Sequence, residues 1–242
     1  MRPEDMMIAM RNALKPGQSF RFHCDQCGDC CRHRKDIILT PFDLNRIARH
    51  FGTTPKAIVD RYCIVYIGDS SRFPVVLLKP EGKDEACPFL KENRCSIHKH
   101  KPTVCALFPL GRALMYEQKN DGSDKREQKL FYFLQDIHCG TKDETHTAKE
   151  WLGEFDLADS EAWFLEWSSA LEKLSLSLRE LEPIVPESIM QIVYNSVFSE
   201  VYLDYHGGIG FMGQFRGNVD RTASMLHAFK DRINAVRGDV GK

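Results

Sequence analysis

Four cysteines lie within eight positions in the segment Phe22-His23-Cys24-Asp25-Gln26-Cys27-Gly28-Asp29-Cys30-Cys31-Arg32, in the pattern CxxCxxCC. A two-residue spacer lets the chain fold back, so that two sulfur atoms converge on one centre while the intervening backbone N–H groups point at them. Gly28 permits the unusual backbone turn that this requires. The side chains of the adjacent Cys30 and Cys31 tend to diverge, so one of them can serve a second centre. The segment predicts a loop-dominated core around a metal site.

Further cysteines follow on loops or at the ends of expected elements, and the chain has nine in total. Cys63 lies in an apolar run, expected to be helical, with Ile64 and Val65, and we expect it to be a small buried hydrophobe rather than a ligand. The predicted metal ligands are the other eight cysteines: Cys24, Cys27, Cys30, Cys31, Cys87, Cys95, Cys105 and Cys139.

Composition excludes several classes of protein. The chain has 242 residues, 43% hydrophobic and 28% charged, and fits one or two globular domains. A net charge of −1 creates no field that would gather nucleic acid or an anionic membrane surface. Apolar runs such as residues 74–78 are far shorter than the roughly 18 residues that cross a bilayer. A secreted disulfide framework is expected to have a signal peptide, an even number of cysteines and a smaller chain. This sequence shows none of the three, so we expect a cytoplasmic protein with reduced thiols.

Two Thr-Pro pairs predict helix starts. Thr40-Pro41 provides a cap and a proline at the first helical position, Asp43 follows three residues after the cap, and Gly52 closes the helix. Thr54-Pro55 starts a second helix in the same way. Both helices are expected to be short, and a further short amphipathic helix is expected within residues 1–19.

Strands are expected at residues 72–78 and in a hairpin that pairs 113–118 with 130–135. The polar loop between the hairpin strands, residues 119–129, contains a turn signal at 120–124.

Helical periodicity takes over from residue 141. One long helix is expected to begin near Asp159, a second is introduced by Pro186, and a third includes residues 225–236. The expected fold class is α+β: a loop-rich cysteine metal-binding core with short helices and a small antiparallel sheet, plus a C-terminal helical subdomain. The expected domains are an N-terminal helix (1–19), a cysteine-cluster domain (20–140) and a C-terminal helical region (141–242).

Several motifs accompany the first cysteine segment in a fixed order: Leu39-Thr40-Pro41-Phe42-Asp43, Cys87-Pro88-Phe89-Leu90, Cys95-Ser96-Ile97-His98, Lys101-Pro102-x-x-Cys105 and Phe108-Pro109-Leu110. This order resembles the bacterial CxxCxxCC cysteine-cluster proteins, a zinc- or iron-chelating family of which flagellin lysine N-methylase is a distant relative. The resemblance covers about residues 20 to 140. The family usually has Tyr where His98 stands and Arg where Lys101 stands. His98 could add an imidazole ligand or replace the hydrogen bond of the tyrosine. The resemblance implies metal or cluster binding and no particular reaction.

Eight thiolates leave the identity of the metal open. They suffice for two tetrahedral zinc sites with four ligands each, and a [4Fe-4S] cluster also takes four thiolates. CxxCxxC with the distant pair Cys87-Pro88 is similar to ferredoxin ligation. A zinc ion, an iron ion and an iron-sulfur cluster therefore remain candidates. Because thiolate sites carry negative charge, the basic run of residues 32–35 is a candidate source of stabilising cations.

No motif for other chemistry is found: GxGxxG, a Walker loop, HExxH and GxSxG are all missing from the sequence. No catalytic residue is predicted, and residues 207–210 are expected to form an interhelical turn. We favour a metal- or cluster-carrying protein, with His23 and His138 as possible donors around the ligands. The alternatives are a metal-dependent protein-modifying enzyme similar to flagellin lysine N-methylase, and a zinc-stapled module whose C-terminal helices bind an unspecified protein partner.

Overall fold

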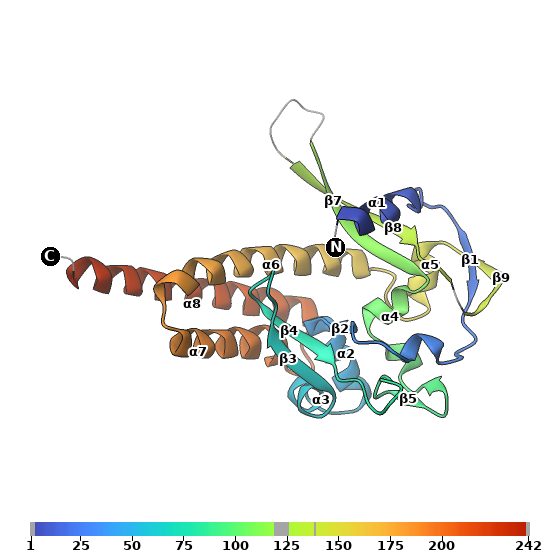
Figure 1. Cartoon of the computed structure of the whole chain (residues 1–242), viewed down its shortest axis with the longest axis horizontal. Helices are drawn as coiled ribbons and strands as arrows, with labels where there is room; N and C mark the ends of the chain where they lie inside the picture. The colour runs from blue at the N-terminus through green and yellow to red at the C-terminus, as the bar shows by residue number, and fades with distance from the viewer. Residues whose placement is uncertain (1–2, 119–125, 138, 241–242) are drawn as a thin grey trace. The chain divides into compact units, whose positions relative to one another are not determined.

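The computed structural model describes residues 3–118, 126–137 and 139–240 (Figure 1). The chain divides into two compact units, each assembled from two separate segments. Unit 1 contains residues 1–34 and 82–161, and unit 2 contains residues 35–81 and 162–242. Helices and small antiparallel sheets occur together, which confirms the α+β class. The three-part domain division stays a prediction. Among the described residues, no helix combines the length and apolar character needed to cross a membrane.

Unit 1 consists of short elements joined by irregular chain. They are α1 (Pro3–Arg11), β1 (Phe20–His23), the 3-10 helix η1 (Asp29–Cys31), β5 (Leu90–Lys91), β6 (Arg94–Cys95), the 3-10 helix η2 (His98–His100), α4 (Thr103–Leu107), β7 (Leu110–Gln118), β8 (Arg126–Leu134), β9 (Thr141–His146) and α5 (Ala148–Gly153). The strands pair antiparallel as β1–β9, β5–β6 and β7–β8.

The β7–β8 hairpin confirms the predicted strand pair, but both strands begin earlier than expected, so residues 126–129 belong to β8 and not to the polar loop. Its register runs from Leu110 opposite Leu134 to Gln118 opposite Arg126, and the turn signal at 120–124 lies outside the described residues. The expected N-terminal helix is present but ends early, at Arg11. The chain after α1 instead runs along β8: the Leu14 N–H donates to the Tyr132 carbonyl at 2.8 Å, and an isolated bridge pairs residue 13 with residue 133.

Trp151 packs three elements of unit 1 together. Its side chain is 1% exposed, and its indole N–H donates to the Ala106 carbonyl of α4 at 2.9 Å. Its ring packs edge-on against Phe22 of β1, at 5.3 Å between centroids, and against Phe155 after α5, also at 5.3 Å. These contacts bury large aromatic surfaces and fix β1, α4 and α5 in one core.

Unit 2 contains one sheet and long helices. Its elements are β2 (Ile38–Leu39), α2 (Pro41–His50), α3 (Pro55–Tyr62), β3 (Cys63–Ile67), β4 (Pro74–Leu78), α6 (Ser160–Leu181, with its first two residues in unit 1), the 3-10 helix η3 (Glu182–Ile184), α7 (Glu187–Phe198), the π-helix η4 (Ser199–Leu203) and α8 (Phe211–Val240). The sheet has the antiparallel order β2–β4–β3.

The predicted helix caps of unit 2 are present. The Thr40 hydroxyl accepts the Asp43 N–H at 3.2 Å, and the Asp43 carboxylate accepts the Thr40 N–H at 3.0 Å, which completes a capping box. The Thr54 hydroxyl accepts the Ala57 N–H at 3.2 Å. The C-terminal helices also begin where they were expected, α6 at Ser160 and α7 directly after Pro186.

The expectation that Cys63 lies in a helical run was wrong. Helix α3 ends at Tyr62, and Cys63 begins β3, where it pairs with Leu78 of β4. Ile64 and Val65 are β-branched and favour extended backbone, and pairing with β4 supplies the hydrogen bonds that a continued helix would have made.

Candidate metal centre

The first cysteine segment turns sharply after β1. Gly28 has φ +80° and ψ 0°, and its carbonyl accepts the Cys31 N–H at 3.0 Å. A Cβ at this residue would lie 2.6 Å from the Asn93 carbonyl oxygen, so only glycine lets the segment approach the turn between β5 and β6. Arg32 braces the same contact, because its guanidinium donates to the carbonyl of Gly28 and to the side chain of Asn93.

Backbone hydrogen bonds bring the second cysteine group to the first. The Cys87 N–H donates to the Cys31 carbonyl at 2.8 Å. The Leu90 N–H then donates to the Cys87 carbonyl at 2.9 Å, and the short β5–β6 pair places Cys95 opposite Leu90. Cysteines that are more than fifty residues apart in the chain therefore share one region of unit 1.

Three thiols accept backbone N–H bonds from the residue two positions later. The donors are Gln26 for Cys24, Phe89 for Cys87 and Ile97 for Cys95. Burial raises the pKa of Cys24 and the Gln26 bond opposes this rise, whereas the pKa values of Cys87 and Cys95 are lowered overall. Amide donors aimed at sulfur stabilise the thiolate, which is the form that binds metal.

One group of thiols surrounds Cys31. Its thiol hydrogen-bonds with those of Cys30, Cys87 and Cys95. These bonds are the largest cause that lowers the pKa of Cys30 to about 6 and of Cys95 to about 7, and they also lower the pKa of Cys87. The pKa of Cys31 is raised, because its proton is the one shared with the other sulfurs. Burial, with the charge on Cys87 second, raises the pKa of Cys105.

A second group contains Cys139. Burial and the charges on Cys27 and Cys30 raise the pKa of Cys139 to about 12, and its thiol hydrogen-bonds with that of Cys27. The charge on Cys24 also raises the pKa of Cys139. The pairing of β1 with β9 brings Cys24, Cys27 and Cys139 into one region. The approach at this point is so close that a Cβ on Gly140 would lie 2.3 Å from the His23 carbonyl oxygen. Strand β9 therefore begins in close contact with the end of β1.

All eight predicted ligands thus gather in unit 1, and all nine cysteines are free thiols. Cys63 lies in unit 2, where burial raises its pKa to about 12 and its thiol donates to the Ile58 carbonyl at 3.9 Å.

Two cations act on the thiols. Lys101 is 7% exposed, its ammonium lies 4.1 Å from the centroid of the Phe155 ring, and its charge lowers the pKa values of Cys30 and Cys95. Arg34 also lowers the pKa of Cys30 and donates to its carbonyl at 3.4 Å. The basic run therefore does contribute a charge to the thiols. Lys101 was noted in its motif with Pro102 and Cys105, but its action on the thiols was missed, because spacing does not show which cysteines its charge faces in the fold.

His98 lies beside this group with an unsatisfied nitrogen. Burial and the charge on Lys101 lower its pKa to about 4, so the ring is neutral at pH 7. Its ring packs edge-on against Phe155 at 5.5 Å, and its buried Nε2 has no hydrogen-bond partner among the described residues. An orphaned nitrogen and a set of converging thiols are the donor chemistry that zinc or iron takes. The other candidate donor, His23, faces Glu144 at 2.9 Å, and His138 lies outside the described residues.

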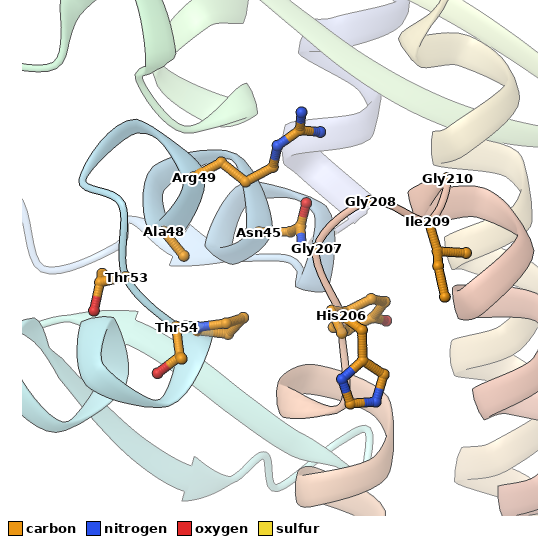
Figure 2. A pocket seen from close by; sticks show the side chains of 12 residues that line it. Asn45, Ala48, Arg49, Thr53, Thr54, His206, Gly207, Gly208, Ile209 and Gly210 are labelled. Carbon is orange, nitrogen blue, oxygen red and sulfur yellow. The ribbon is translucent and has the colours of Figure 1, made fainter.

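Unit 2 offers a pocket of about 400 Å³, but no cysteine lines it. Figure 2 shows Asn45 and Arg49 of α2 on one side and the chain from His206 to Gly210 on the other. Residues 207–210 form the interhelical turn that was predicted, between η4 and α8. The residues that line the pocket offer no comparable set of metal donors.

Comparison with known families agrees with the thiol geometry. A sequence model of the CxxCxxCC family, described as "Putative zinc- or iron-chelating domain", matches residues 23–131. The resemblance found in the motifs is confirmed. The matched range includes the predicted ligands from Cys24 to Cys105, and Cys139 lies outside it. No curated protein and no solved structure matches the chain.

Proposed function

Because residues 23–131 belong to the zinc- or iron-chelating CxxCxxCC family, we propose that unit 1 binds two metal ions in neighbouring sites of four thiolates each. The ions are zinc or iron. The proposed sites are a first one with Cys31, Cys87, Cys95 and Cys105, and a second one with Cys24, Cys27, Cys30 and Cys139.

The interactions of Cys139 carry this proposal. Its thiol forms a hydrogen bond with that of Cys27, and the charges that raise its pKa are those of Cys24, Cys27 and Cys30. Cys31 bonds to Cys87 and Cys95 as well as to Cys30, and the charge on Cys87 raises the pKa of Cys105 more than that on Cys30 does. The bond between the adjacent Cys30 and Cys31 makes the two sites neighbours, and assigning the two cysteines to different ions avoids the strain of binding one ion through both.

Thiol contacts support single ions over a cubane cluster. With Zn–S bonds of about 2.3 Å, two sulfurs of a tetrahedral site lie about 3.8 Å apart, which is similar to the separation of hydrogen-bonded thiols. A cluster attaches each cysteine to a different iron atom and spreads the sulfurs further apart.

Charge and folding both favour occupancy. A divalent ion with four thiolates carries about −2, and the charges of Lys101 and Arg34 offset part of it. The cysteine segments consist of short turns and two-residue strands, which provide little stability alone. Metal binding free energy therefore becomes folding free energy of unit 1, so the ions hold the fold together as well as being carried by it.

Element analysis with acid-labile sulfide determination on the untagged full-length chain tests the proposal. We expect two zinc or iron ions per chain, no labile sulfide, and one ion in both Cys139→Ser and Cys95→Ser. Cys63→Ser is the matched control, and it should keep both ions because Cys63 lies in unit 2. Four irons with labile sulfide would overturn the single-ion sites in favour of a cluster. Loss of both ions in each single variant would overturn the division into two sites.

A further inference from the structure

Unit 1 contains a second set of metal donors that includes no cysteine. Glu144 and His146 of β9 and Glu154, directly after α5, bring one donor atom each to within 4.8 Å of one another. Glu144 and His146 are two residues apart on a strand, so they project from the same face. The folding of α5 back over β9 adds Glu154. Both carboxylates are exposed and accessible to an ion from solvent.

The imidazole of His146 is held in one orientation. Its ring is 12% exposed and packs against Trp151 at 5.3 Å and Phe20 at 6.0 Å. Its Nε2 lies 3.1 Å from the Phe22 carbonyl oxygen and 3.4 Å from a Glu144 oxygen, which are both acceptors. The tautomer that carries the proton on Nε2 satisfies both of these acceptors. A histidine that donates one ring N–H to a backbone carbonyl presents its other nitrogen as a metal ligand.

That other nitrogen faces a carboxylate. Nδ1 of His146 lies 3.6 Å from Glu154 Oε1. In the neutral ring, the Nδ1 lone pair and the negative oxygen repel each other, and a cation between them removes the repulsion. The cation is either a proton, which makes an imidazolium ion pair, or a metal ion.

Local charge favours a divalent cation over the single proton. Within the described part of the chain, neither Glu144 nor Glu154 forms an ion pair with a lysine or arginine; their partners are His23 and His146. Asp25 adds a further carboxylate to this region, since its Oδ1 lies 3.9 Å from Nε2 of His23. Three carboxylates therefore face two imidazoles here, an arrangement that favours a divalent cation.

We propose that Glu144, His146 and Glu154 form a binding site for a divalent first-row transition ion, separate from the thiolate sites. Imidazole and carboxylate donors suit zinc, iron(II) and manganese(II). Three protein ligands leave at least one coordination position for water or another ligand. This site requires no cysteine and does not depend on the function proposed above.

Calorimetric titration of Zn²⁺ into the full-length chain tests the site, after the thiols have been saturated with zinc and no longer react with a thiol reagent. We expect one additional ion per chain. Glu154→Gln should weaken its binding at least about tenfold, the lower range for loss of a metal-site partner. Asp156→Asn is the matched control. It removes the same charge two residues away, and Asn tolerates the left-handed backbone of Asp156, φ +57°.

Two outcomes would overturn this inference: no additional ion in the unmodified chain, or equal binding in Glu154→Gln and Asp156→Asn. Glu144→Gln provides a second variant should Glu154→Gln fail to fold. A chain whose thiols take up no zinc, but which binds an ion in a Glu154-dependent way, would support this site and refute the thiolate sites. Zinc bound to the thiols without the additional ion would support the thiolate sites and refute this site.

Discussion

Replacing Gly28 by alanine should destabilise unit 1 by about 2–5 kcal/mol, because two costs add at this residue. Its φ of +80° lies in the left-handed region, where an L-residue costs about 1–2 kcal/mol. The new Cβ would also lie 2.6 Å from the Asn93 carbonyl oxygen, 3.0 Å from Leu90 Cδ1 and 3.1 Å from Arg32 Nη1. The backbone of the β5–β6 turn must therefore move, and overpacking of this kind costs about 1–3 kcal/mol.

Gly82→Ala carries the first cost alone, so the difference between the two variants gives the second. Gly82 has a φ of +70° in the same unit, but a Cβ there would meet no atom within 4 Å, so we expect a loss of about 1–2 kcal/mol. Urea unfolding of the cobalt-substituted proteins, followed by the thiolate-to-cobalt absorbance, reports on unit 1 alone. The Gly28 variant should also bind cobalt more weakly, since moving the turn moves Cys95. Equal losses of stability in the two variants would refute the close approach of the first cysteine segment to the β5–β6 turn.

Further predictions concern charge, pH and capping. Lys101→Met should raise the pKa of Cys95 above about 7 in metal-free protein, measured by ultraviolet thiolate titration, while Lys101→Arg should not; equal titrations would contradict the role of the charge. Because folding lowers the pKa of Cys95 from 9.0 to about 7, the stability that its thiolate contributes is complete above about pH 9 and is lost as the pH falls through 7. The stability difference between metal-free wild type and Cys95→Ser in urea should therefore shrink from alkaline to acid pH. Thr40→Ala should cost about 1 kcal/mol of unfolding free energy, with Thr40→Ser as the control, and element analysis should find its metal content unchanged, because this cap lies in unit 2.

Helix starts could be predicted because their determinants are local. The side chains of Thr40 and Thr54 each accept an N–H from a residue only three positions later. Both partners of each cap therefore lie within the same short stretch of sequence. Cys63 shows the opposite case. Its run is apolar and short, which suits a helix or a strand, and the choice is made by β4, which starts eleven residues later. Pairing partners of this kind lie outside any local window.

The candidate ligands could be chosen from spacing, but their grouping could not. Cys27 and Cys139 come together only because β9 pairs with β1 across more than a hundred residues, and that pairing was not predicted. Lys101 acts on the thiols through space, from a buried position over Phe155. The Glu144, His146 and Glu154 group was also missed. The chain has 34 acidic residues and 9 histidines, so one histidine near two glutamates in the sequence carries no signal without the fold.

The β1–β9 ribbon separates two of the proposed thiolate ligands, Cys24 and Cys139, from the proposed site at His146. Cys24 directly follows β1, and Cys139 precedes β9 by two residues, so both sulfurs lie at the end of the ribbon where His23 pairs with Thr141. His146 pairs with Phe20 at the other end. Five strand residues at about 3.3 Å each separate Thr141 from His146 by about 17 Å, far beyond the reach of one coordination sphere. The Cys24 and Cys139 thiolates and the His146 imidazole therefore cannot bind one ion together, and it is the length of the ribbon, rather than the preference of any metal, that keeps these donors apart.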